Sequence, residues 1–279
     1  MRVPAAVAQV PVCWSVRRNV GTILDAIGGV AAGTVLVLPE CALSGYDDQL
    51  SGLDRLDPAE LAAARDEVAR AAQRSGVHVF CGTLLPEHGR WWNAAYYFPP
   101  GGEPWVYRKV NLAMHERGRL AAGGALATAA VQLPGGVLQA GVQLCREIRF
   151  PEQWACLARQ GAQALIYLTY AVNPAEPPGV WRAHLISRAA ETQRFVLAAN
   201  VAGQHQHCPT MIVSPRGQVL AEAATGQTEI VRHIIDLAAT RDGYLSQQRG
   251  DLIAVSYRPG QAGQAGQAGQ AGQAGVTAD

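Results

Sequence analysis

The sequence contains no apolar run that approaches the roughly 20 residues needed to span a bilayer as a helix. It also lacks an excess of charge, because 23 lysine and arginine residues balance 22 aspartate and glutamate residues and leave a formal net charge of +1. The arginines are scattered rather than gathered into one basic surface. We therefore expect neither nucleic acid nor a membrane as a partner.

The N-terminus lacks the features of a secretory signal peptide. Its apolar stretch is short, Gln9 and Pro11 interrupt it, and no clear cleavage site follows. We interpret residues 3–10 as a first strand and expect a cytoplasmic protein.

The cysteines lack the CxxC spacing of a redox or metal motif. A chain of 279 residues, 49% of them hydrophobic, can bury a core without disulfide bonds. Most of the thiols are therefore expected to be small, free, buried side chains. The six are Cys13, Cys41, Cys81, Cys145, Cys156 and Cys208.

Three possible zinc ligands, His205, His207 and Cys208, stand close together in the sequence. A closed zinc site requires four ligands, and no second cluster with matching spacing is present. A metal-binding regulator is therefore only a minor alternative.

Short apolar runs alternate with helical patterns along the chain. One helix is expected after Asp57, a candidate N-cap, because Pro58 suits the first helical position and Gly76 suits the end. Strands are expected at 3–10, 34–38, 77–83, 92–98, 104–110, 128–133, 137–144, 163–169, 195–200 and 228–236, with a hairpin turn at 214–217. The alternation predicts an α/β fold with mixed sheets, and two sheets faced by helices would accommodate these strands.

The last part of the chain, from about Pro259, repeats Gly-Gln-Ala. Without bulky apolar side chains, this segment cannot offset its ordering entropy by burial. We expect one domain over residues 1–258 and a disordered tail over 259–279.

Glu40 directly follows the apolar run of residues 35–38. Ligand sites in open α/β sheets lie beyond the carboxyl ends of strands, where a partly buried carboxylate can act as a general base. The alternative is an ordinary solvated loop glutamate, which the position alone would favour.

Lys109 lies at the end of the predicted strand 104–110, and Cys145 follows the predicted strand 137–144. A buried lysine beside a carboxylate can stabilise an oxyanion, although a lysine at a strand end is more often solvated. A thiol exposed at a strand-to-helix turn can act as a nucleophile, but a structural buried thiol explains the same context equally well. His115 could pair with a cysteine as in papain-like enzymes, but nothing specific supports this pairing.

Glu40, Lys109 and Cys145 lie in three motifs that follow one another along the chain. The motifs are LPECALSGY at 38–46, YRKVNL at 107–112 and CREIRFPE at 145–152. The chain thereby resembles the nitrilase superfamily of carbon–nitrogen hydrolases, and most closely its amidase and N-carbamoylase branches. The helical segment 181–191 and the turn at 214–217 agree with the resemblance, which spans roughly residues 3–257.

The resemblance implies a four-layer αββα sandwich that forms a homodimer and needs no metal or organic cofactor. It also implies that Cys145 is the nucleophile, that Glu40 is the base, and that Lys109 and the backbone N–H of Arg146 stabilise the oxyanion. Glu116 is the best match for a second glutamate near the lysine. The implied substrate is a small amide, ureido compound or nitrile.

The motifs depart from the family pattern at Arg146, where Tyr, Trp or Asn is common. The Arg146 side chain would by default form a surface ion pair, but it could instead bind a substrate carboxylate. Tyr46 and Tyr170 are further candidates for the substrate pocket. The absence of a Cys-Trp-Glu sequence favours an amide over a nitrile, and both a nitrilase and a catalytically idle dimeric binding protein remain alternatives.

Overall fold

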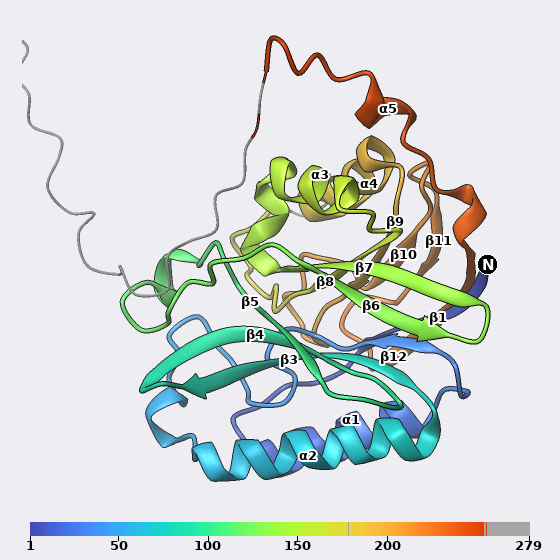
Figure 1. The fold of residues 1–279 in the computed structure, drawn as a ribbon. Helices are drawn as coiled ribbons and strands as arrows, with labels where there is room; N and C mark the ends of the chain where they lie inside the picture. The colour runs from blue at the N-terminus through green and yellow to red at the C-terminus, as the bar shows by residue number, and fades with distance from the viewer. Residues whose placement is uncertain (178, 254, 256–279) are drawn as a thin grey trace, which may run out of the picture.

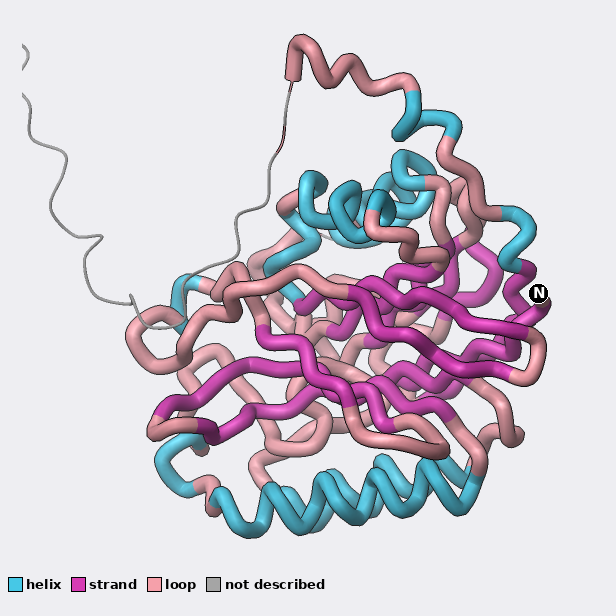
Figure 2. Tube along the Cα trace, viewed as in Figure 1, coloured by secondary structure: helices cyan, strands magenta, loops and turns pink. Residues whose placement is uncertain are grey.

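A computed structural model describes residues 1–177, 179–253 and 255. Two six-stranded sheets lie face to face, and helices cover their outer surfaces (Figures 1 and 2). The chain therefore forms a four-layer αββα sandwich, which confirms the predicted fold class. The repeat tail at 259–279 lies outside the described residues, so the domain boundary at 258 stays a prediction.

The first sheet has the strand order β12-β1-β2-β3-β4-β5. Its strands are β1 (Arg2–Gln9), β2 (Val35–Val37), β3 (His78–Glu87), β4 (Arg90–Phe98), β5 (Trp105–Arg108) and β12 (Glu229–Asp236). β1 pairs in parallel with β2 and antiparallel with β12, so strands from both ends of the domain lie side by side at one edge of this sheet. β3 and β4 form a hairpin whose turn contains His88 and Gly89, both with positive φ.

The second sheet has the order β11-β10-β9-β8-β7-β6. Its strands are β6 (Thr128–Leu133), β7 (Gly136–Leu144), β8 (Ala164–Leu168), β9 (Phe195–Ala199), β10 (Met211–Val213) and β11 (Val219–Glu222). β7, β8 and β9 are parallel, and β9 pairs antiparallel with β10. The turn predicted at 214–217 joins β10 to β11, as expected.

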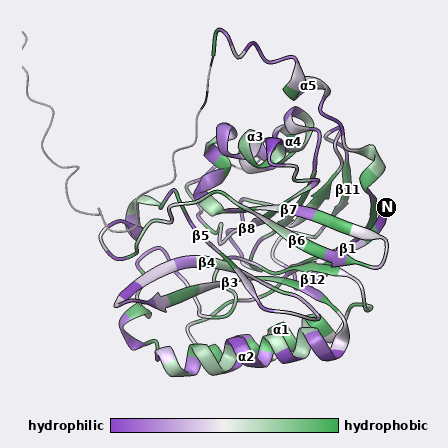
Figure 3. Cartoon of the chain, viewed as in Figure 1, coloured by the Kyte–Doolittle hydropathy of each residue, from purple (hydrophilic) through white to green (hydrophobic). Residues whose placement is uncertain are grey.

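Helices cover the outer face of each sheet. α1 (Val16–Gly28) and α2 (Pro58–Ser75) lie on the first sheet, α3 (Pro151–Arg159) and α4 (Val180–Thr192) lie on the second, and the short α5 (Gly243–Ser246) contacts α4 (Figure 1). In Figure 3, α2 carries hydrophilic and hydrophobic residues along its length, as a half-buried helix requires. No helix in the described part of the chain combines the length and apolar character needed to cross a membrane.

The ends of α2 are the ones that the sequence predicts. The Asp57 side chain accepts a hydrogen bond from Ala59 N at 2.8 Å, and Pro58 occupies the first turn. Gly76 ends the helix in the left-handed conformation with a φ of 64°.

The main core lies between the sheets, where β1 faces β9 and β2 faces β8. Strands β2 and β5 of the first sheet and β7 and β8 of the second sheet each lead into a segment with reactive or polar groups. Packing the two sheets together brings these four segments into one place, which is where the candidate site lies.

Candidate active site

Cys145 follows directly after β7 and begins a 3-10 turn, Cys145–Arg149, that precedes α3. Its φ of 41° is a left-handed conformation that non-glycine residues rarely adopt. The hydroxyl of Tyr167 donates to the Cys145 carbonyl oxygen at 2.7 Å and helps to hold this conformation. Such strain in an over-determined position is typical of functional sites.

Among the buried cysteines, Cys145 differs in its access to solvent. It is 9% exposed, whereas Cys41 and Cys208 are 0% exposed and Cys81 is 1% exposed. Cys145 also borders a small cavity, so its thiol is the one of these four that a small molecule can reach.

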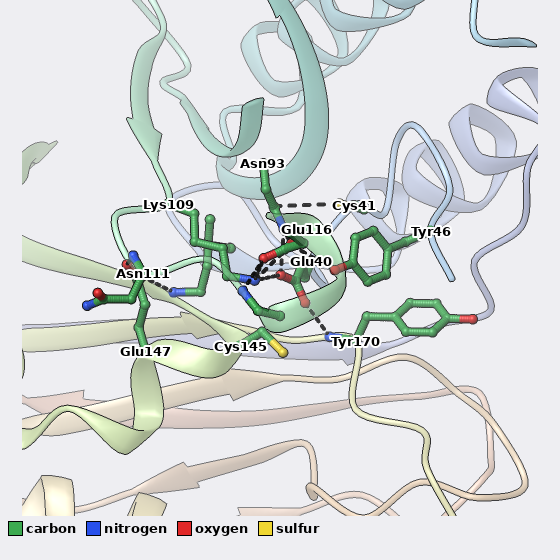
Figure 4. A network of polar contacts seen from close by, with 12 residues as sticks. Glu40, Cys41, Tyr46, Asn93, Lys109, Asn111, Glu116, Cys145, Glu147 and Tyr170 are labelled. Carbon is green, nitrogen blue, oxygen red and sulfur yellow. Dashed lines mark hydrogen bonds and ion pairs between the residues drawn. The ribbon is translucent and has the colours of Figure 1, made fainter. Parts of the chain in front are cut away.

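Lys109 lies one residue beyond β5 and is completely buried between two carboxylates. Its Nζ is 2.9 Å from Glu40 Oε1 and 2.9 Å from Glu116 Oε2. Both glutamates are also fully buried. Three of the predicted catalytic residues therefore meet in one ionic cluster, and Cys145 lies beside it (Figure 4).

Asn93, in the middle of β4, completes this cluster (Figure 4). Its Nδ2 donates to Glu40 Oε1 at 2.8 Å and to Glu116 Oε1 at 2.6 Å, so its two amide hydrogens serve one carboxylate each. The Cys41 thiol donates to Asn93 Oδ1 at 3.6 Å, on the other side of the amide. Asn93 thus joins the two carboxylates without adding charge.

Backbone donors complete the binding of both carboxylates. Tyr170 N–H donates to Glu40 Oε2 at 2.8 Å, and Ala113 N–H donates to Glu116 Oε2 at 2.6 Å. Because Tyr170 follows β8, the first of these bonds ties Glu40 of the first sheet to the second sheet.

Tyr46 is buried and uses its hydroxyl within the site. The hydroxyl donates to Glu116 Oε1 at 2.7 Å and lies 2.7 Å from His115 Nε2. The Tyr46 ring also packs against the Tyr170 ring, with centroids 5.3 Å apart. His115 is therefore bonded to a tyrosine hydroxyl, and within the described residues no hydrogen bond links it to Cys145.

The cluster determines the charge states of its members. Burial alone would lower the pKa of Lys109, but the Glu116 and Glu40 carboxylates outweigh burial and hold that pKa well above its ordinary value. Burial opposes ionisation of Glu116, yet Lys109 and the hydrogen bonds from Asn93 and Tyr46 lower its pKa. The lysine is therefore a cation and Glu116 a carboxylate at neutral pH.

The Cys145 thiol, unlike Lys109 and Glu116, is held in its neutral form. Burial and the nearby Glu40 carboxylate raise its pKa to about 12, although Lys109 partly opposes them. The thiol is therefore protonated at neutral pH, and an attack by its sulfur requires a base that takes the proton.

Glu147 connects the turn that carries Cys145 to the segment that carries Lys109. Its Oε1 accepts from Tyr107 Oη at 2.8 Å, from Val110 N at 2.8 Å and from Asn111 N at 3.1 Å. Its Oε2 accepts from Leu144 N at 2.8 Å. Burial raises the pKa of Glu147 to about 7, even though the hydrogen bonds act in the opposite direction.

The cavity beside the thiol has a volume of about 40 Å³, which suits a small reacting group. Residues from several segments line it, among them Cys145, Arg146, Tyr46, Asp48 and Tyr170. All three residues predicted for substrate binding are thus present in its wall. The surface ion pair expected for Arg146 is not formed within the described part of the chain, where its guanidinium has no acidic partner.

The three possible zinc ligands do not form a metal site. His207 Nδ1 accepts a hydrogen bond from Asn173 N at 3.0 Å, and the Cys208 thiol is completely buried. Within the described ranges, no group of three or more His, Cys, Asp or Glu side chains is arranged to hold a metal ion. The metal-binding alternative therefore has no structural support.

Asn93 and Glu147 are residues of the site that the sequence interpretation missed. Asn93 carried one signal, since it is a polar residue between Trp92 and Ala94 in a strand that is otherwise mostly apolar or aromatic. Glu147 belongs to the third motif, but nothing in its local sequence indicates that its carboxylate is buried.

The fold and the cluster define a class of protein, a hydrolase with a buried Glu–Lys–Glu cluster beside a cysteine in an αββα sandwich. Residues 4–243 match the family model described as "Carbon-nitrogen hydrolase". The chain belongs to the carbon–nitrogen hydrolase family, which confirms the resemblance drawn from the motifs, and it is an enzyme of that family.

Two curated relatives illustrate the similarity. The chain is 34% identical over 212 residues to a 2-oxoglutaramate amidase of Bacillus subtilis, covering 73% of this chain and 78% of the relative. It is 29% identical over 222 residues to the omega-amidase NIT3 of Saccharomyces cerevisiae, covering 72% and 74% of the two chains.

Solved structures of the nitrilase superfamily share the fold. The Nit3 structure of Saccharomyces cerevisiae superimposes with a TM-score of 0.74 at 24% identity and covers 88% of this chain and 94% of its own. An amidase from Nesterenkonia sp. superimposes with a TM-score of 0.75 at 22% identity, covering 90% and 94%.

Proposed function

We propose that the protein hydrolyses the C–N bond of a small, non-peptide amide through a thioester on Cys145. The observation that carries this proposal is the completely buried Lys109, held at 2.9 Å by both Glu40 and Glu116 beside an accessible thiol. The amidase names of the two curated relatives favour an amide over a nitrile.

In the first half of the reaction, Glu40 takes the thiol proton as the Cys145 sulfur attacks the amide carbon. This step needs a base because the pKa of the thiol is raised to about 12. Lys109 and the backbone N–H of Arg146 stabilise the negative oxygen of the tetrahedral intermediate. Glu40 then gives the proton to the leaving nitrogen, the C–N bond breaks, and a thioester and ammonia or an amine result.

In the second half, Glu40 takes a proton from water, whose oxygen attacks the thioester carbon. The carbon–sulfur bond breaks, the sulfur recovers the proton from Glu40, and a carboxylic acid leaves. Glu116 supports both halves by holding the Lys109 ammonium, while Tyr46 donates to Glu116. Splitting the reaction in this way replaces one difficult displacement with two easier ones.

Arg146, Tyr46 and Tyr170 are proposed to contact the substrate. The two tyrosine rings pack together in the cavity wall, so they suit the apolar part of a small acyl group. Because the Tyr46 hydroxyl already donates a hydrogen bond to Glu116, we assign the contact between Tyr46 and the substrate to the ring.

Ammonia release from small amides, ureido acids and nitriles tests this function. The wild type is compared with Cys145→Ala and with Cys156→Ala, a matched change at a half-buried cysteine outside the cavity. We expect release by the wild type and Cys156→Ala only, and amides to be preferred. Equal release by Cys145→Ala would refute the mechanism, and a preference for nitriles would establish the nitrilase alternative. The panel also includes substituted amides, for which amine release is measured. If no compound is hydrolysed, the result would support the idle binding protein.

The protein is also proposed to work in the cytoplasm as a homodimer. All six cysteines are free, as a reducing compartment favours. The segment after α5 presents exposed apolar side chains, namely Leu252, Ile253 and Val255. A mass measured by light scattering at twice that of the chain would support the dimer, and a monomer at micromolar concentration would refute it.

A further inference from the structure

Two charged residues in the cavity wall have no partner among the described residues. Arg146 directly follows Cys145 and is half-buried, and Asp48 is exposed on the loop that follows Tyr46. Neither side chain forms a hydrogen bond or an ion pair within the described part of the chain. One cation and one anion therefore face the same cavity without neutralising each other.

The other charged groups of this wall are already engaged. Glu176 forms an ion pair with Arg149 at 3.3 Å, and the Arg149 guanidinium also lies over the Trp181 ring. His207 is occupied by the N–H of Asn173, and burial lowers its pKa, so it is neutral at pH 7. With Glu176 paired to Arg149, the wall presents one free charge of each sign, Asp48 and Arg146.

We propose that the substrate is zwitterionic, the side-chain amide of a short α-amino acid, with Arg146 binding its carboxylate and Asp48 its ammonium group. This inference rests on the proposed amide hydrolysis and assigns the substrate class of the same site. A guanidinium binds a carboxylate through two parallel N–H donors, so Arg146 provides the stronger contact. Asp48 is exposed and screened by solvent, so it provides the weaker one.

The size of the cavity agrees with this orientation. About 40 Å³ accommodates the reacting amide group but not a bulky acyl chain. The amide would enter toward Cys145 and Lys109, and the charged end would stay at the mouth. An anionic substrate without an amino group would leave Asp48 unpaired, and a neutral amide would leave both charges unpaired.

Four amides that share the same four-carbon chain, counted from the amide carbon, distinguish the carboxylate contact from the ammonium contact. L-glutamine carries both charged groups, glutaramate lacks the amino group, 4-aminobutanamide lacks the carboxylate, and butanamide lacks both. Values of kcat/KM are measured for each with the wild type, Arg146→Met and Asp48→Asn. The methionine keeps the apolar stem of the arginine, and Arg216→Met on the exposed β10–β11 turn serves as the control.

We expect the wild type to prefer L-glutamine. Arg146→Met should lower kcat/KM about 10- to 100-fold for the two compounds with a carboxylate and by less than about threefold for the other two. Asp48→Asn should lower it up to about fivefold, and only for the two compounds with an amino group. Arg216→Met should change none of them.

Equal losses on all four compounds, or no loss with Arg146→Met, would overturn the proposal. A preference for glutaramate with no effect of Asp48→Asn would overturn the ammonium contact specifically. Failure of this inference is distinguishable from failure of the proposed function, because Cys145-dependent hydrolysis of butanamide would persist in the first case and be absent in the second.

Discussion

Gly82 allows the polypeptide backbone of β3 to approach the backbone of Glu40. A Cβ at this position would lie 2.3 Å from Cys41 N and 2.6 Å from Glu40 Cα, about 1 Å short of ordinary contact at 3.4 Å. The loop cannot simply move away, because Gly82 N–H donates to Pro39 O at 3.1 Å and Leu43 N–H donates to Gly82 O at 3.0 Å. Gly82→Ala must therefore displace the candidate base.

The expected loss follows from the size of this displacement. A shift of about 1 Å in a catalytic group costs about 100-fold in rate. Overpacking of this kind destabilises a fold by about 1–3 kcal/mol, and each kcal/mol lowers the Tm of a chain of this size by about 2–4 °C. We expect kcat/KM for a small amide to fall about 100-fold in a protein that remains folded at 25 °C.

The assay combines ammonia release with thermal unfolding followed by circular dichroism. Gly21→Ala is the matched control, because Gly21 lies in α1 and a Cβ added there would meet no atom within 4 Å. This control should gain up to about 1 kcal/mol in stability at unchanged activity. A Gly82→Ala protein that keeps its activity within about threefold would refute the assigned position of Glu40. Equal losses in both variants would refute the steric argument.

Three further predictions concern the buried cluster and the Glu147 carboxylate beside it. Lys109→Met should lower kcat about 100- to 1000-fold, because it removes the proposed oxyanion donor, and should lower the Tm by leaving two buried carboxylates unpaired; steady-state kinetics and calorimetry measure the two effects. Asn93→Leu should move the acid limb of the kcat/KM profile to higher pH, since ionised Glu116, which holds the Lys109 ammonium, loses a donor that lowers its pKa, whereas a purely structural role would leave that limb in place. Glu147 has a pKa raised from 4.5 to about 7, so the folded state binds its proton more tightly and this group's contribution to stability falls as pH rises from about 4.5 to 7. The difference in urea-unfolding free energy between pH 5 and pH 8 should therefore shrink by up to about 3 kcal/mol in Glu147→Gln, and an unchanged difference would contradict the assignment.

The sequence predicted the positions of Glu40, Lys109 and Cys145 because each follows an apolar strand and stands in a motif. The structure places them where those strands end, in one cluster. The local sequence does not reveal the role of Asn93, because that role depends on the pairing register that sets it opposite Leu84 in β3. Such long-range pairing leaves little trace in the local pattern.

The environment of charged side chains was also beyond local sequence reasoning. Glu147 follows a cysteine and an arginine in a turn, a context that suggests a solvated acid. Its complete burial arises because Val110 and Asn111, in the segment that follows β5, reach the end of β7. Arg146 was expected to find a surface partner, but within the described residues it forms no ion pair, although Asp48 and Glu176 line the same cavity.

The location of the cluster between the two sheets is costly for the fold. Burying an ion costs several kcal/mol even after relaxation, and apolar side chains of similar volume would often be as stable. Here two acidic residues and one basic residue are fully buried, and four neutral donors, from Asn93, Tyr46, Ala113 N and Tyr170 N, complete their hydrogen bonds. Because stability alone does not require this arrangement, its retention beside an accessible protonated thiol is best explained by chemistry that needs a positioned base and a positioned cation at the same carbon atom.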